Sequence, residues 1–166
     1  MATANLTPVE DAIQHILSTA TQPAEVTTVA IEQTLGRVLA RDYTVPADVP
    51  PADNSAVDGY ALRAADFQPG KPLLVSARIP AGQAPEPLVA GTAARIFTGS
   101  EVPPGADTVV MQERTRVEAD GVLIEGDVNP DQNIRRRGQD LAVGDLALAR
   151  GTRIRPQEMG LLASMG

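Results

Sequence analysis

Residues 50–61 hold the densest group of side chains that could do chemistry. Two prolines stiffen the approach to this segment, and Gly59 permits a sharp turn directly after Asp58. A loop of this kind can direct several oxygen atoms toward one point, as a cation or polyanion site requires. Taken alone, the pattern slightly favours a capped turn before a helix, with Asp58 at the surface. The polar members of the segment are Asp53, Asn54, Ser55, Asp58 and Tyr60.

A second polar segment follows a run that predicts a strand. Thr98-Gly99-Ser100 offers two hydroxyl groups around a flexible backbone, which suits hydrogen bonding to an oxyanion. Any turn that ends a strand has a similar composition, so these residues alone are weak support for a site. Glu113, at the end of the next predicted strand, fits a structural role as well as a functional one.

The third polar segment is a run of arginines, Arg135 to Arg137, followed by Gly138 and Asp140. The guanidinium group is a planar fork that pairs bidentately with oxyanions, and Asp140 could orient an arginine. Runs of like charge are more often solvated surface or salt-bridged interface. The two interpretations remain open on the residues alone.

Composition excludes several classes of protein. The chain has 166 residues, 2% aromatic residues, no cysteine and a net charge of −7, so we expect neither nucleic-acid nor membrane binding. The missing cysteines exclude disulfides and thiolate chemistry and fit a cytoplasmic location. His15 is the single histidine, which argues against a histidine-based triad or zinc site.

The two ends of the chain have helical patterns and the middle does not. Residues 45–144 hold 11 of the 14 prolines and 10 of the 14 glycines, with short β-prone runs between them. Asp120-Gly121 predicts a hairpin turn. The predicted helices are 8–20 with a capping box of Thr7 and Glu10, 35–40, 60–67 and one opening at Pro156. The predicted strands are 27–31, 73–79, 92–97, 108–112, 115–118, 122–124, 146–148 and 153–154, and residues 43–45 are predicted to be extended.

These elements predict an α+β protein. Residues 1–44 and 145–166 form a small mixed α/β linker domain, and residues 45–144 form a small all-β domain inserted into it, shaped as a barrel or sandwich. No repeat or low-complexity tract interrupts this organisation.

Three strings resemble one family in the same order. They are D-N-S-A-V-D-G-Y-A at 53–61, R-I-F-T-G-S at 95–100 with its continuation to Glu113, and N-I-R-R-R-G-Q-D at 133–140. Together they are similar to the molybdopterin molybdenumtransferases, the MoeA/gephyrin E-domain family. The resemblance implies insertion of molybdenum from molybdate into adenylylated molybdopterin, with Mg²⁺ and release of AMP. It also implies the linker and inserted-domain arrangement.

The resemblance assigns roles to matching residues. It implies that Asp58 faces a cleft against the neighbouring subunit's catalytic domain and is a candidate Mg²⁺ ligand. The expected catalytic residues are Asp58, Thr98, Arg135 and Asp140, and the expected substrate-binding residues are Asp53, Ser55, Ser100 and Arg136.

The resemblance also predicts a missing catalytic domain and the partners of this chain. Family enzymes carry glycine-rich pterin and molybdate loops in a later domain, and no such loop occurs in this sequence, which predicts a part of a longer chain that is inactive alone. The implied partners are a second copy, the pterin nucleotide and other cofactor-biosynthesis proteins. The alternative function is a non-catalytic interaction or scaffold module, in which the same β domain docks a partner protein.

Overall fold

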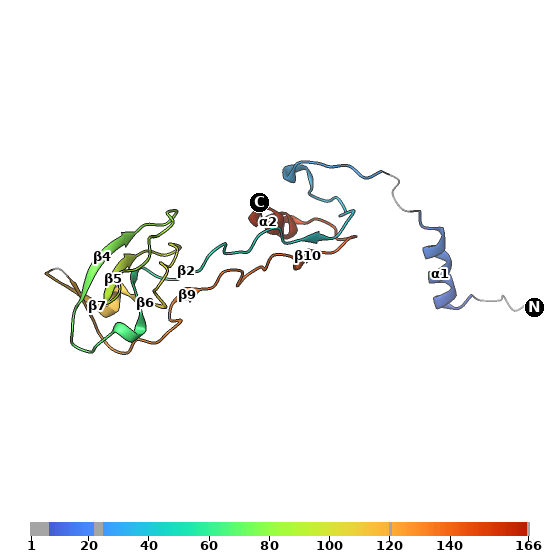
Figure 1. Ribbon diagram of the computed structural model, residues 1–166. Coiled ribbons are helices and arrows are strands. Elements are labelled where there is room, and N and C mark those ends of the chain that lie inside the picture. The colour runs from blue at the N-terminus through green and yellow to red at the C-terminus, as the bar shows by residue number, and fades with distance from the viewer. Residues whose placement is uncertain (1–6, 22–24, 120, 166) are drawn as a thin grey trace, which may run out of the picture.

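A computed structural model describes residues 7–21, 25–119 and 121–165. A six-stranded sheet occupies one end of the molecule, and two chain segments lead from it to a smaller part containing the helix α2 (Pro156–Ser164). The first helix, α1 (Val9–Thr19), stands beyond that smaller part (Figure 1). The site residues predicted from the sequence therefore belong to the sheet and the two segments that leave it.

The large sheet has the strand order β6-β3-β5-β4-β8-β7. Its strands pair antiparallel except β4 and β5, which are parallel. Five of the strands were predicted to within one residue at each end. The strands are β3 (Gly59–Leu62), β4 (Leu73–Ile79), β5 (Thr92–Ile96), β6 (Thr108–Met111), β7 (Thr115–Glu118) and β8 (Gly121–Ile124).

The predicted hairpin between the last two strands is confirmed. β7 and β8 pair antiparallel, with Glu118 opposite Gly121 and Val117 opposite Val122. Residue 120, half of the predicted Asp120-Gly121 turn, lies outside the described residues.

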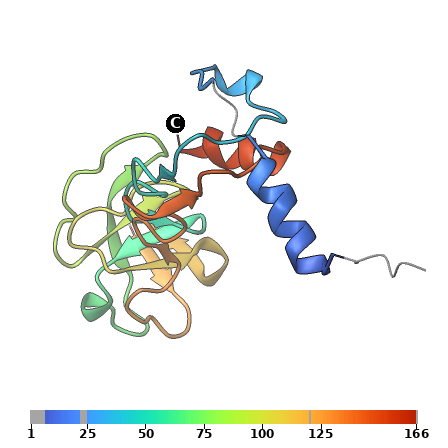
Figure 2. The ribbon, with the colours of Figure 1, turned by 90° about the vertical axis from the view of Figure 1, so that its right-hand side faces the viewer.

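The sheet curls around its own core (Figure 2). The strands β3, β5 and β6 are almost fully buried, whereas β4 and β7 keep several residues exposed. One cluster includes Tyr60, Leu62 and Val110, and a second includes Ala61 and Ile96. Consecutive residues of β3 thus contact opposite clusters, and all four residues of the strand are buried. Burial of this aliphatic surface is the main force that holds the β unit together.

The helix predicted over residues 60–67 is wrong. Gly59–Leu62 is the strand β3, which pairs with β5 on one side and β6 on the other, and only Ala64–Asp66 forms a short 3-10 helix. Because β3 is covered on both faces it lacks the polar–apolar alternation that marks a strand, and pairing on both edges outweighs local preference.

Two antiparallel segments connect the sheet to the smaller part of the molecule (Figure 1). At the sheet end, β2 (Asn54–Ser55) pairs with β9 (Ile134–Arg135), and at the far end β1 (Tyr43–Thr44) pairs with β10 (Leu146–Leu148). Between them the amide of Val49 donates to the carbonyl of Leu141 at 2.8 Å. The outgoing and returning chains therefore run side by side.

The smaller part differs from the sequence prediction in three places. The predicted strand at 27–31 is wrong, because only a 3-10 helix, Ile31–Gln33, forms there. The predicted helix at 35–40 is also wrong. Gly36 takes a positive φ of 80° and Val38 forms a single bridge with Arg153, so the chain turns and becomes extended. At the predicted strand 153–154, the structure has only this single bridge.

The helices expected at the two ends are confirmed, but the capping box at the first is wrong. Pro8 is the N-cap of α1 and no side chain caps it, because the helix begins one residue later than Thr7 and Glu10 would require. At α2 the carboxylate of Glu158 instead accepts the Arg155 amide at 2.9 Å. Among the described residues, no helix is long and apolar enough to cross a membrane.

Candidate functional site

The three polar segments meet at Ser55. Its strand, β2, pairs with β9, which places Ser55 opposite Ile134 and Asn54 opposite Arg135. The Ser55 amide donates to the carbonyl of Ser100 at 2.9 Å, and the Ser55 carbonyl accepts the amide of Gly99 at 2.8 Å. Backbone hydrogen bonds thus join segments that lie far apart in the sequence.

Asp58 and Thr98, both predicted as catalytic, are in direct contact. The Asp58 Oδ1 atom accepts the Thr98 amide at 2.8 Å and the Thr98 hydroxyl at 2.7 Å. The Thr98 amide, followed by its hydroxyl, lowers the pKa of Asp58 below its ordinary value, and the charge of Arg95 acts in the same direction. Asp58 is therefore an oriented carboxylate that is ionised at neutral pH.

Arg135 and Asp140, the other predicted catalytic residues, form an ion pair with each other. Both side chains are about half exposed, at 43% and 45% of their surface. Within the described part of the chain, no hydrogen bond or ion pair joins this pair to Asp58 and Thr98. The structure thus brings the four residues together as two pairs on neighbouring segments.

Arg136 and Asp53, predicted to bind substrate, pair with one another instead of standing open. Arg136 also pairs with Asp131, whose φ of 65° lies in the left-handed region. Burial raises the pKa of Asp53, but the Arg137 amide and the Arg136 guanidinium outweigh it, so the pKa lies below its ordinary value. The Arg136–Asp53 pair fastens the residue before β2 to the segment after β9.

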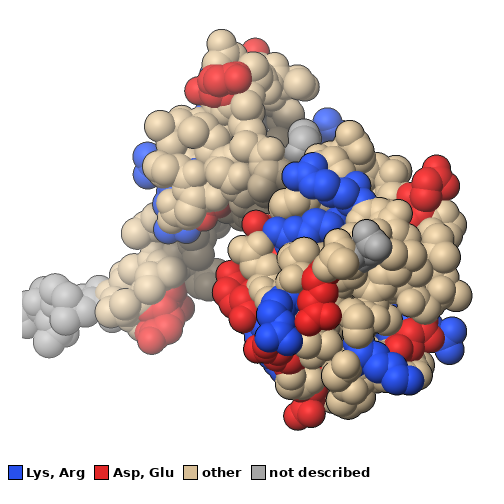
Figure 3. Space-filling view, turned by 90° about the vertical axis from the view of Figure 1, so that its left-hand side faces the viewer, with Lys and Arg blue, Asp and Glu red and all other residues tan. Residues whose placement is uncertain are grey.

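The last arginine of the run continues the same pattern. The Arg137 Nε atom donates to Asp48 at 2.6 Å, and the amide of Val143 donates to the other oxygen of that carboxylate at 2.8 Å. The Val143 amide and then Arg137 lower the pKa of Asp48. Acidic and basic side chains are accordingly interspersed on the face shown in Figure 3. The run of arginines is paired along its length.

The two serines predicted to bind substrate are buried. Ser55 is 1% exposed and its hydroxyl donates to the carbonyl of Val57 at 2.6 Å, while Ser100 is 0% exposed and its hydroxyl has no partner among the described residues. Their backbones bring the segments together, and their role in substrate binding stays a prediction.

Asp58 is the carboxylate available for the Mg²⁺ that the resemblance implies. Among the described residues, no group of three or more histidine, cysteine, aspartate or glutamate side chains could hold a metal ion. Mg²⁺ commonly takes one or two protein carboxylates and completes its shell with water and substrate phosphates. Asp58 therefore fits a shared ligand of a hydrated ion.

Sequence reasoning missed Arg95, although it opens the R-I-F-T-G-S string. Its Nη1 atom donates to the carbonyl of Gly59 at 2.9 Å, and its Nη2 atom donates to the Gln112 side chain at 2.6 Å. The Gln112 amide in turn donates to the carbonyl of Asp58 at 2.9 Å. Its place three residues before Thr98 was the signal that could have found it.

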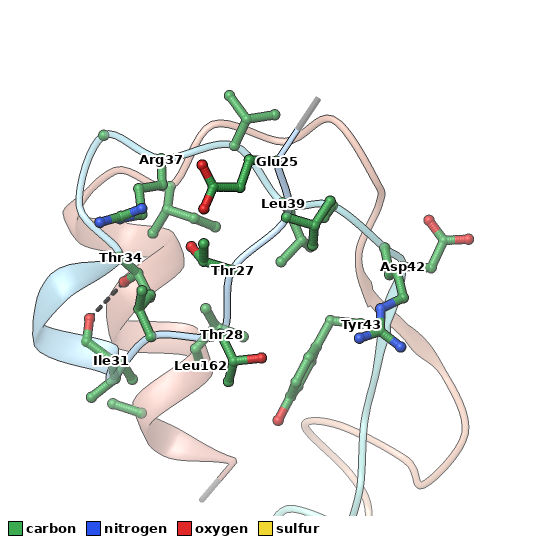
Figure 4. Close-up of a pocket in the computed structure, with 18 residues that line it drawn as sticks. Glu25, Thr27, Thr28, Ile31, Thr34, Arg37, Leu39, Asp42, Tyr43 and Leu162 are labelled. Atoms are coloured by element: carbon green, nitrogen blue, oxygen red, sulfur yellow. Dashed lines mark hydrogen bonds between the residues drawn. The ribbon is translucent and has the colours of Figure 1, made fainter. Parts of the chain in front are cut away.

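A large pocket of about 1030 Å³ lies in the smaller part of the molecule, away from these residues. Figure 4 shows the side chains of Thr28, Leu39, Tyr43 and Leu162 around it, contributed by the extended N-terminal segment and by α2. None of the predicted site residues lines it. This pocket is therefore separate from the polar cluster around Asp58.

Comparison with known proteins identifies the class. The family model for the MoeA N-terminal region, domains I and II, matches residues 7–166. The chain is 38% identical over 146 residues to the molybdopterin molybdenumtransferase of Haemophilus influenzae, covering 87% of this chain and 36% of that protein. For the Staphylococcus aureus protein of the same name the identity is 37% over 169 residues, covering 98% and 40%.

The solved structure of the molybdopterin biosynthesis moeA protein from Pyrococcus horikoshii has the same fold. It superposes with a TM-score of 0.86 at 37% identity, over 98% of this chain and 44% of that one. The mixed α/β architecture with a curled sheet is thus that of MoeA N-terminal regions. The chain belongs to the MoeA family of molybdopterin molybdenumtransferases.

Both the predicted family and the predicted fold class are confirmed by these matches. The chain spans 36% to 40% of the length of the curated relatives it matches. The proposed division at residues 45 and 144 stays a prediction.

Proposed function

We propose that this chain forms part of an enzyme of molybdenum-cofactor biosynthesis that inserts molybdenum from molybdate into adenylylated molybdopterin and releases AMP. The observation that carries the proposal is Asp58. It is an ionised carboxylate, held by two hydrogen bonds from Thr98, three residues after the Ser55 that joins the three family strings. Such anchoring keeps a charged group in one orientation before a substrate arrives, which is the requirement for electrostatic catalysis.

The remaining predicted residues have complementary chemistry. Arg135 offers a guanidinium fork for an oxyanion such as molybdate or a phosphate, and Asp140 orients it. Mg²⁺ bound beside Asp58 would supply charge neutralisation for the phosphate groups of the substrate. Asp58 and Thr98 would hold that end of the substrate in place.

The set of groups on this chain is incomplete, which favours a shared site. Our proposal is a two-fold dimer in which another part of a second subunit supplies the pterin pocket. Every residue of α1 is exposed or half-buried, and apolar side chains such as Ile16, at 66% exposed, need a cover. A two-fold interface would use the same patch on both copies.

The test of the function is substitution of Asp58 in the full-length enzyme. Asp58→Asn keeps an oxygen for the two Thr98 donors but removes the charge, so we expect turnover to fall by two orders of magnitude or more, roughly the effect of losing one stabilising charge in an active site. Asp127→Asn is the matched control, since Asp127 is an exposed carboxylate outside the three strings. If Asp58→Asn retains full turnover, the assignment is wrong.

Sharing of the site is tested by mixing subunits. An Asp58 variant is combined with a variant that lacks the pterin loop, each inactive alone. Random pairing should restore about a quarter of wild-type activity, because half of the dimers are mixed and each mixed dimer has one intact site. Proven exchange without recovery would mean that each chain builds its site alone.

A further inference from the structure

Arg95 binds the main chain directly at Gly59 and, through Gln112, at Asp58, and we propose that it is a positioning residue for the Asp58 carboxylate. One guanidinium nitrogen donates to the carbonyl of Gly59, the residue after Asp58, at 2.9 Å. The other donates at 2.6 Å to the side-chain oxygen of Gln112, and the backbone N–H of Gln112 donates to the carbonyl of Asp58. The inference rests on the function proposed above for Asp58.

Arg95 is itself held in place by its surroundings. Its strand neighbours Ala94 and Ile96 are 0% exposed, so the backbone at Arg95 is fixed in the sheet. The guanidinium carbon lies 4.6 Å from the centre of the Phe97 ring and 5.3 Å from that of Tyr60. Stacking on aromatic rings and a planar donor fork give arginine a defined orientation that lysine lacks.

Two separate sets of hydrogen bonds hold Asp58 in place. Thr98 binds the carboxylate, through its amide and its hydroxyl. Arg95 and Gln112 bind the main chain on which that carboxylate is mounted. Without Arg95 the turn loses the hydrogen bonds from the guanidinium group to Gly59 and Gln112. The hydrogen bonds from Thr98 are then left to orient the Asp58 carboxylate.

Arg78 provides a matched control within the same sheet. It lies opposite Arg95 in the parallel β4–β5 register, and its guanidinium carbon is also 4.6 Å from the centre of the Phe97 ring. Among the described residues it makes no hydrogen bond to the Asp58 turn. Loss of Arg78 therefore removes an equal charge and an equal contact with the Phe97 ring, but it leaves the proposed link intact.

The experiment compares Arg95→Met with Arg78→Met in this chain by NMR. Arg95→Met should speed hydrogen exchange of the Gln112 amide by about fivefold, as expected for loss of one supporting hydrogen bond, and should raise the pKa of Asp58 in a carboxyl titration. Arg78→Met should change neither. The amides of β8 serve as a reference, because general destabilisation would accelerate them equally.

A second variant keeps the test decisive if Arg95→Met fails to fold. Gln112→Ala truncates an exposed side chain and breaks the same link from its other end, so exchange of the amide at position 112 should again accelerate. Unchanged exchange in the folded variants, or equal changes on losing Arg78 and Arg95, would overturn the proposal. Neither readout requires turnover, so this inference and the role of Asp58 in catalysis can fail separately.

Discussion

Gly59→Ala should lower the free energy of unfolding of the β unit by more than a glycine-to-alanine change usually does. A Cβ at this position would lie 2.0 Å from the Val110 carbonyl oxygen and 3.0 Å from the Met111 Cα. Both are backbone atoms of β6, which pairs with β3 at this point, so relief requires the two strands to separate. Overpacking of this kind costs about 3 kcal/mol, which corresponds to a fall of roughly 6–12 °C in Tm for a chain of this length.

Gly160→Ala is the control for that measurement. Gly160 lies inside α2, and a Cβ there would meet no atom within 4 Å. Alanine should therefore stabilise the helix by about 1 kcal/mol. Thermal unfolding followed by circular dichroism compares the two variants with the parent chain. A Gly59→Ala protein that melts within about 2 °C of the parent, roughly 0.5 kcal/mol, would refute the packing argument at the Asp58 turn.

Three further predictions concern activity, acid stability and independent folding. The 166-residue chain alone should not turn over adenylylated molybdopterin, as a direct assay would reveal. The hydrogen bond from Arg155 lowers the pKa of Glu158 from 4.5 to about 2. The stability that this pair contributes is therefore complete above pH 4.5 and is lost as the pH falls toward 2. In Glu158→Gln, an acid titration of the stability of α2 should no longer show this loss. Residues 45–144 alone should give a dispersed NMR spectrum, and a disordered one would contradict the predicted inserted domain.

The strands of the sheet could be predicted where turn residues in the sequence mark their ends. Glycine or proline lies just before β4, β5 and β6, and the Asp120-Gly121 pair marks the hairpin that joins β7 to β8. The pattern failed for β3 because a strand covered on both faces and paired on both edges shows no alternation. It also failed for β2 and β9, whose two residues each are too few to form a pattern.

The sequence could single out candidate site residues, which stay a prediction, but not the pairing among them. The strings identified Asp58 and Thr98, and these are in contact. The same strings gave no sign that Arg136 pairs with Asp53, because the two residues are 83 positions apart. Such a pairing depends on the register of β2 against β9, which is set by the whole connection between the two parts of the molecule.

The ion pairs along 135–137 are compatible with a binding role because they are exposed. The Arg135 and Arg136 side chains are 43% and 49% exposed, and exposed ion pairs contribute only about 0–1 kcal/mol each. An incoming phosphate or molybdate could therefore replace Asp140 or Asp53 at little cost, whereas the anchoring of Asp58 by Thr98 involves a backbone amide that cannot turn away. We infer that the arginines can change partners in the proposed site, whereas Asp58 keeps one orientation. The proposed function therefore depends most on the positioning of Asp58 by Thr98 and Arg95.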